Sequence, residues 1–181
     1  MSNVVVTGER KRFLPPFFMH NLRHNCFVVG AGLRHGGDVR YNCTIIDLHD
    51  RSVVASVTDR RMTSDLAIRT LGKALKSQRK RSKGLILHSD QGSPYTSKAF
   101  TAFCEEHDLT QSMSKAGYPY DNALMERYFN TLKNEEIYLH EYRDEESLYH
   151  AVEHFAYTTY NHVRPHSYNG YRTPFEARYS T

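Results

Sequence analysis

The 181-residue sequence has few cysteines and no long apolar run. Its three cysteines, Cys26, Cys43 and Cys104, are an odd and sparse set, which argues against a disulfide framework and favours a reducing compartment. No apolar stretch approaches the roughly 20 residues that a membrane-spanning helix needs. The first residues also lack the basic, apolar and small-residue order of a secretion signal. We therefore expect a soluble, cytoplasmic protein that does not enter a membrane.

Acidic residues are scarce at the amino end. Residues 1–36 contain one acid, Glu9, against five basic residues, and no Asp precedes Asp38. This stretch has no clear hydrophobic period, which predicts a divergent or poorly ordered leader, with a basic nucleic-acid-contacting arm as the alternative. The whole chain carries a formal charge of +4, which is compatible with nucleic acid but is not diagnostic of it.

From residue 39 onward the hydrophobic pattern is regular. Residues 39–47 and 52–58 predict two strands, and the apolar residues 27–33 in front of them complete a three-stranded meander. Thr63 is placed to cap a helix over residues 64–77, whose leucines recur at helical spacing.

The second half of the sequence alternates strands with helices. Residues 84–88 predict a buried strand, a helix begins at Ser97, and residues 108–113 predict a last strand. Two further helices follow, one after a turn that ends near Asp121 and one over residues 145–160. A meander followed by this alternation predicts an α/β fold of ribonuclease-H-like type, with a mixed central sheet flanked by helices.

Two carboxylates occupy positions suited to chemistry. Asp90 follows the strand over residues 84–88, at the end where open α/β sheets place their active sites. Glu126 shares one helical face with Asn122, Asn130 and Lys133. Hard carboxylate oxygens suit Mg²⁺ or Mn²⁺ rather than zinc, and two such ions stabilise the attacking and leaving oxygens of a phosphodiester displacement. The alternative is that both are ordinary surface acids.

The segments around these acids resemble the signatures of DDE retroviral-integrase-like transposases, and specifically the insertion-sequence transposases of the IS-three type. Asp90 and Glu126 are separated by 35 residues, and Lys133 follows seven residues after Glu126. The matching segments, which lie within about residues 37–178, are His88–Ser97 (HSDxGxxY(T/S)S), Tyr120–Glu126 (YDNAxxE), Thr131–Glu135 (TLKxE) and Tyr160–His166 (YNxxRxH), with Pro174 and Glu176 after them.

This resemblance implies an integrase-type catalytic core that hydrolyses a phosphodiester at the end of an insertion sequence and joins the freed strand to target DNA. Asp90 and Glu126 would be the catalytic residues and the ligands of Mg²⁺ or Mn²⁺. The residues implied in DNA binding are Lys133, Asn122, Tyr120 and Arg127. The implied partners are DNA ends and target, further copies of the chain on DNA, and a separate helix-turn-helix protein or segment for end recognition.

One part of the family pattern is missing. The first catalytic Asp of the family lies on the first strand, near residues 28–30, where this sequence has no acid. Asp47 and Asp38 are the candidates to replace it. We therefore divide the chain into a leader over residues 1–36, with room for the first core strand at 26–33, and a catalytic core over residues 37–178. The alternative function is a degenerate, catalytically impaired core that only binds DNA.

Overall fold

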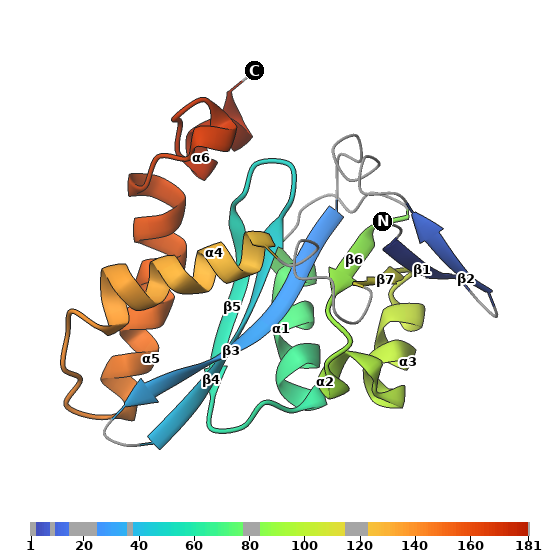
Figure 1. The fold of residues 1–181 in the computed structure, drawn as a ribbon, viewed down its shortest axis with the longest axis horizontal. Helices are drawn as coiled ribbons and strands as arrows, with labels where there is room; N and C mark the ends of the chain where they lie inside the picture. The colour runs from blue at the N-terminus through green and yellow to red at the C-terminus, as the bar shows by residue number, and fades with distance from the viewer. Residues whose placement is uncertain are drawn as a thin grey trace.

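A computed structural model describes residues 3–7, 10–14, 25–35, 38–77, 84–114 and 123–180. Its strands form one seven-stranded sheet in the order β2-β1-β7-β6-β3-β4-β5 (Figure 1). The strands are β1 (Asn3–Thr7), β2 (Arg10–Leu14), β3 (Asn25–His35), β4 (Asp38–Asp47), β5 (Val53–Asp59), β6 (Ile86–Ser89) and β7 (Thr110–Met113). The helices are α1 (Ser64–Ser77), α2 (Ser93–Thr96), α3 (Lys98–Glu106), α4 (Ala123–Leu132), α5 (Glu145–His154) and α6 (Pro174–Tyr179), with π-helices η3 (Lys133–Ile137) and η4 (Phe155–Val163) and the 3₁₀ turn η5 (Ser167–Asn169).

The sheet is mixed, as the sequence predicts. Strands β3, β4 and β5 form the antiparallel meander, whereas β6 lies parallel to β3 and β7 lies parallel to β6. The register of the β3–β6 pair places Val28 opposite Ser89. This register matters for function because it brings the carboxyl end of β6, which Asp90 follows, next to the middle of β3.

Part of the predicted leader belongs to the sheet. Strand β3 contains the first core strand that the sequence allows at residues 26–33, and β1 extends the sheet beyond β7 in the antiparallel sense. The domain boundary at residue 36 stays a prediction. The basic run over residues 78–83 lies outside the described residues.

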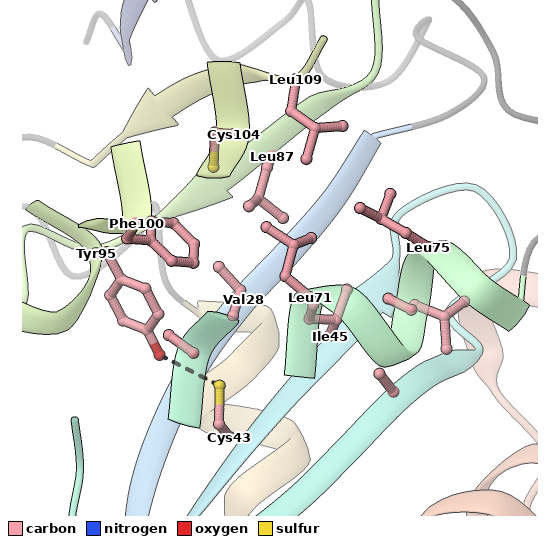
Figure 2. Packing of buried hydrophobic residues seen from close by; sticks show 14 of the residues in the cluster. Val28, Cys43, Ile45, Leu71, Leu75, Leu87, Tyr95, Phe100, Cys104 and Leu109 are labelled. Atoms are coloured by element: carbon pink, nitrogen blue, oxygen red, sulfur yellow. Dashed lines mark hydrogen bonds between the residues drawn. The ribbon is translucent and has the colours of Figure 1, made fainter. Parts of the chain in front are cut away.

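Two hydrophobic clusters cover the two faces of the sheet. One lies under α1 and α3 and includes Val28, Ile45, Leu71 and Phe100 (Figure 2). The other lies under α4, α5 and η4 and includes Leu33, Ile46, Met125, Tyr128, Val152 and Phe155. Helix α4 runs across the meander in Figure 1, with its apolar face against the strands and its other face outward. The sheet therefore fixes the position of the helix that carries Glu126.

Cys43 and Cys104 behave as small buried hydrophobic residues. Both are buried in the first cluster, and the Cys43 sulfur lies 3.8 Å from the Tyr95 hydroxyl (Figure 2). Burial raises the pKa of the Cys43 thiol to about 11 and that of Cys104 to about 12. Both thiols therefore remain protonated at neutral pH, which excludes a nucleophilic role.

Helix starts follow the capping chemistry of the sequence. The Thr63 hydroxyl oxygen accepts the N–H of Leu66 at 3.2 Å, and Ser97 accepts the N–H of Phe100 at 3.2 Å. The single helix expected over residues 145–160 is instead α5 followed by η4, whose wider turn begins at Phe155.

The edge strand β5 is closed by a side chain of η4. Asn161 accepts the N–H of Val53 at 2.8 Å and donates its amide to the Val53 carbonyl at 3.0 Å. These two hydrogen bonds replace those that a neighbouring strand would make. Asn161, a residue of the Tyr160–His166 signature, therefore protects the edge of the sheet. No helix among the described residues is long and apolar enough to cross a membrane.

Candidate active site and nucleic-acid interface

Asp90 lies directly after β6, at its carboxyl end. Its Oδ1 accepts the backbone N–H of Gly92 at 2.8 Å, which closes a tight turn around the carboxylate. A Cβ atom at position 92 would lie 2.8 Å from the same Oδ1, closer than real Cβ contacts come. A side chain at position 92 would therefore displace the Asp90 carboxylate, and Gly92 leaves the space in which that carboxylate lies.

The turn is anchored to the end of β7. The Gln91 amide donates to the Ser114 carbonyl at 3.0 Å, and the Ser114 N–H donates to the Ser89 carbonyl at 2.9 Å. These bonds join the loop after β6 to its neighbour in the sheet. They hold the Asp90 segment on a rigid base, as a catalytic carboxylate requires.

His88 supports this base from inside the protein. Its two ring nitrogens lie 2.8 Å from the Ser112 hydroxyl and 3.0 Å from the Ser114 hydroxyl. Burial lowers the His88 pKa to about 4, so the ring is neutral at pH 7. This geometry favours a structural role for His88, because both ring nitrogens already have hydroxyl partners.

Glu126 is exposed on the first turn of α4. It lines a shallow groove of about 370 Å³ together with Ala123, Arg127, Asn130, Thr131, Asn134 and Glu135. Lys133 is half-buried at the start of η3 and is not among the residues that line this groove. Asn122 and Tyr120 lie outside the described residues.

The described part of the chain does not assemble a complete metal centre. It contains no group of three or more His, Cys, Asp or Glu side chains that could hold a metal ion. Asp90 and Glu126 are hard oxygen donors of the type that Mg²⁺ and Mn²⁺ prefer, but they supply only two of the three acids that the family pattern implies. The residues present therefore fit the metal only in part.

Asp47 does not replace the missing acid. Its Oδ2 accepts the Arg178 Nη2–H at 2.8 Å, and its Oδ1 accepts the His49 N–H at 2.9 Å. Asp47 on β4 pairs with Cys26 on β3, and Cys26 pairs with Leu87 on β6. Leu87 precedes Asp90 by three residues, and β4 is two strands away from β6 in the sheet. These steps amount to roughly 10 Å along the strands and roughly 10 Å across them. This geometry argues against Asp47 as the third ligand, and the cleavage assay of Asp47→Asn given below tests it.

Asp38 is no better placed. Asp38 pairs with His35 at the far end of β3. The residue of β3 that pairs with Ser89, next to Asp90, is Val28, which lies seven residues before His35. That separation is roughly 23 Å along the strand. The Asp38 carboxylate is instead 3.4 Å from the Arg40 guanidinium.

The backbone position beside Asp90 belongs to Val29. Val28 and Ser89 are partners on the parallel strands β3 and β6. The next residues on the two chain segments are Val29 and Asp90, so these two positions lie at the same level. An aliphatic residue thus stands at the level of the sheet where a first acid would lie beside Asp90.

A second, larger hollow adjoins the Glu126 groove, and we call it the arginine cavity. It has a volume of about 570 Å³ and shares Ala123, Arg127 and Thr131 with the groove. Its other lining residues are Arg51, Leu124, Tyr160, Arg164, Pro165, His166, Ser167, Tyr168 and Tyr171. Sequence reasoning names Arg127 for DNA binding and includes Tyr160, Arg164 and His166 in a signature. It misses Arg51 and Tyr168, which no motif marks.

Tyr95 is a buried residue of the first hydrophobic cluster. Its side chain is 2% exposed and packs edge-on against Phe100, with 5.6 Å between the ring centroids. A ring this deeply buried cannot stack on a base, so Tyr95 is a packing residue. Tyr118 lies outside the described residues.

Comparison with known families confirms the class of protein that this fold suggests. Residues 28–119 match the integrase core domain family, and residues 107–174 match a second integrase core domain model. The first match covers about half of the chain, so the chain belongs to the integrase core domain family.

The curated relatives are proteins of insertion sequences. The chain is 33% identical over 162 residues to Transposase InsF for insertion sequence IS3A of Escherichia coli strain K12, which covers 84% of this chain and 56% of InsF. It is 35% identical over 134 residues to the insertion element IS600 uncharacterized 31 kDa protein of Shigella sonnei, covering 74% of this chain and 49% of that protein. The chain thus spans about half the length of these relatives, and the resemblance to IS-three type transposases is confirmed.

Solved structures of retroviral integrases share the fold. The HTLV-2 integrase catalytic core domain in complex with magnesium, in its dimeric form, superposes with a TM-score of 0.67 at 17% identity, covering 87% of this chain and 97% of that chain. The BIV integrase catalytic core domain gives a TM-score of 0.65 at 17% identity, covering 86% of this chain and 93% of that chain. The ribonuclease-H-like prediction is confirmed at the level of the fold.

Proposed function

We propose that this chain is the catalytic core of a DNA transposase of the IS-three type, which cuts a phosphodiester at an insertion-sequence end and joins it to target DNA. The observation that carries this proposal is the place of Asp90, held by a glycine turn at the carboxyl end of β6 beside β3. Membership of the integrase core family and 33% identity to an InsF transposase support it.

The residues that we assign to DNA are those of the outer face of α4 and its flanks. Asp90 and Glu126 are the proposed catalytic acids. Positive side chains around them neutralise phosphate charge and align the strand, and this alignment is the larger part of what a protein contributes to phosphodiester displacement. The proposed DNA contacts are Arg127, Lys133, Asn122 and Tyr120.

For the metal we propose Mg²⁺ or Mn²⁺, with Asp90 and Glu126 as ligands. Such an ion, where bound, would supply charge neutralisation at the attacking and leaving oxygens. The described residues provide only part of its site, so the chemistry that depends on the ion would be weakened in this chain.

The incomplete set of metal ligands supports a second candidate function, a core that binds DNA without cutting it. Asp47 is bound to Arg178, Asp38 lies at the far end of β3, and Val29 stands beside Asp90. The comparisons with known proteins do not favour this alternative over an active core.

Cleavage and joining of a labelled insertion-sequence end, in Mg²⁺ and then in Mn²⁺, separate the two candidates. An active parent that loses activity in Asp90→Ala and Glu126→Ala but keeps it in Asp47→Asn supports the transposase core and the geometry given for Asp47. An inactive parent that gains activity in Val29→Asp supports the impaired core. Inactivity of both proteins on DNA that they bind contradicts the transposase proposal.

We also propose that the chain acts as a homo-oligomer on DNA and that a separate helix-turn-helix protein or segment recognises the element ends. The relatives extend well beyond the part that this chain matches, which leaves them room for such a segment. Sedimentation of the chain with and without an element end tests the oligomer, and competition by unrelated DNA tests end recognition.

A further inference from the structure

Segments far apart in the sequence meet in the arginine cavity. Arg51 comes from the turn between β4 and β5, Arg127 from α4, and Arg164 from the end of η4. The cavity shares Arg127 with the groove that contains Glu126. A ligand in the cavity would therefore lie beside the proposed catalytic acid on the same helix.

The charge in the cavity is positive and only partly compensated. Arg164 forms an ion pair with Glu135, whose carboxylate oxygens lie 3.0 Å from the Arg164 guanidinium. Neither Arg51 nor Arg127 forms an ion pair with a residue that the structure describes. The Nε of Arg51 is buried and has no hydrogen-bond partner within the described ranges. A buried cationic donor without a partner, in Arg51, and an exposed guanidinium without an ion pair, in Arg127, favour an anionic ligand, and a phosphodiester is the anion that this fold would meet.

The walls of the cavity are aromatic as well as basic. The Arg51 guanidinium lies 3.8 Å from the centroid of the Tyr168 ring, and Tyr168 itself is 49% exposed. Tyr171 is 78% exposed at the rim. An exposed ring that is already positioned by a guanidinium offers a flat surface on which a nucleobase stacks.

The lining of the cavity also includes His166. The His166 Nε2 is buried and has no hydrogen-bond partner among the described residues, and the ring packs edge-on against Tyr160 with 4.6 Å between the ring centroids. Burial and the nearby charge of Arg164 lower the His166 pKa to about 4, so the ring is neutral at pH 7. A neutral imidazole ring adds no charge, so the positive charge of the cavity comes from its arginines.

We propose that the arginine cavity binds one unpaired nucleotide of a DNA strand, with its phosphate at Arg51 and Arg127 and its base against Tyr168. This inference rests on the proposed function, since it takes DNA as the ligand. The volume of about 570 Å³ lies within the usual range for a small-molecule site, roughly 300–1,000 Å³, and suits one nucleotide rather than a duplex. Unpairing one nucleotide here would bring the adjacent phosphodiester towards the Glu126 groove.

Binding of two labelled DNAs tests the proposal with the full chain. One is a blunt duplex, and the other is the same duplex with a short single-stranded overhang that carries 2-aminopurine. The variants are Tyr168→Ala and Arg127→Gln, and the matched controls are Tyr138→Ala and Arg143→Gln, whose side chains are exposed outside the cavity. Circular dichroism verifies that each variant is folded.

The parent should bind the overhang more tightly than the blunt duplex and quench 2-aminopurine. Tyr168→Ala should lose about tenfold in affinity for the overhang, together with the quench, because stacking of one base contributes on that order. Its affinity for the blunt duplex should change less than about twofold. Arg127→Gln should weaken both complexes and reduce the salt slope by about one. The controls should match the parent.

Equal affinity of the parent for the two DNAs, or equal loss on both DNAs in Tyr168→Ala, overturns the cavity as a nucleotide site while leaving the proposed function standing. Failure of the parent to bind either DNA overturns both proposals. A folded Arg51→Gln variant that keeps the parent's preference for the overhang also overturns the assignment of the phosphate.

Discussion

Arg178 of α6 holds the turn between β4 and β5, and its removal should destabilise the whole fold. Its Nε–H donates to Asp50 Oδ2 at 2.6 Å and its Nη2–H donates to Asp47 Oδ2 at 2.8 Å. The Asp50 side chain is 3% exposed, and its Oδ1 accepts the N–H of Ser52 at 2.8 Å. Arg178→Gln would leave this carboxylate buried with a single backbone donor.

The size of the loss follows from burial. Removal of one partner of a buried ion pair costs about 3–5 kcal/mol, because the remaining charge is left uncompensated. The Arg178 side chain is 26% exposed, so water replaces part of its effect, and we expect a loss of about 2–3 kcal/mol. For a chain of this size each kcal/mol lowers Tm by roughly 2–4 °C, so Tm should fall by about 4–12 °C.

Thermal and urea unfolding of Arg178→Gln measure this loss. The double variant Arg178→Gln with Asp50→Asn should recover part of it, because the buried charge is then gone. Arg143→Gln is the control, since Arg143 is 90% exposed and its ion pair should contribute less than about 1 kcal/mol. A Tm for Arg178→Gln within 1 °C of the parent, or about equal to that of the control, would refute the reasoning.

Three further predictions concern the turn at Asp90, pH dependence and the sheet edge. Gly92→Ala should push the Asp90 carboxylate aside and lower DNA cleavage by about 10²-fold with little change in DNA affinity, which single-turnover assays and anisotropy would show. Hydrogen bonds from Ser147 lower the Asp144 pKa to about 2, so its contribution to stability is present above its unfolded pKa near 3.8 and is lost as pH falls towards 2. Asp144→Asn should flatten that part of the pH profile of Tm. Asn161→Leu should lose about 1–3 kcal/mol in urea unfolding, because two backbone groups of β5 lose their partners.

The local features of the fold follow from sequence alone. Thr63 and Ser97 cap their helices as expected, and the three strands of the meander lie within a residue or two of their predicted bounds. These features are predictable because a capping side chain bonds only within the first turn of its own helix, and a strand is marked by the alternation of apolar and polar residues along its own sequence. The position of Asp90 at the end of β6 can be predicted for the same reason, because Asp90 follows the apolar strand directly in the sequence.

Helix α6 was missed although the sequence contains a signal for it. Thr173 accepts the Glu176 N–H at 3.1 Å while the Glu176 carboxylate accepts the Thr173 N–H at 2.8 Å, with Pro174 at the first helical position. This capping box with proline is a recognisable start, and attention to it would have found the helix.

The residues of the arginine cavity and the partner of Asp47 depend on tertiary contacts instead. Arg51 and Arg127 are 76 positions apart, and Asp47 and Arg178 are 131 positions apart, so no local pattern relates them. Asp47 follows an apolar strand as a catalytic acid would, and only its ion pair and its register relative to Asp90 show that it serves the fold. Sequence specifies which side chains are available at each strand end, whereas the packing of α4, η4 and α6 on the sheet selects which of them face one another.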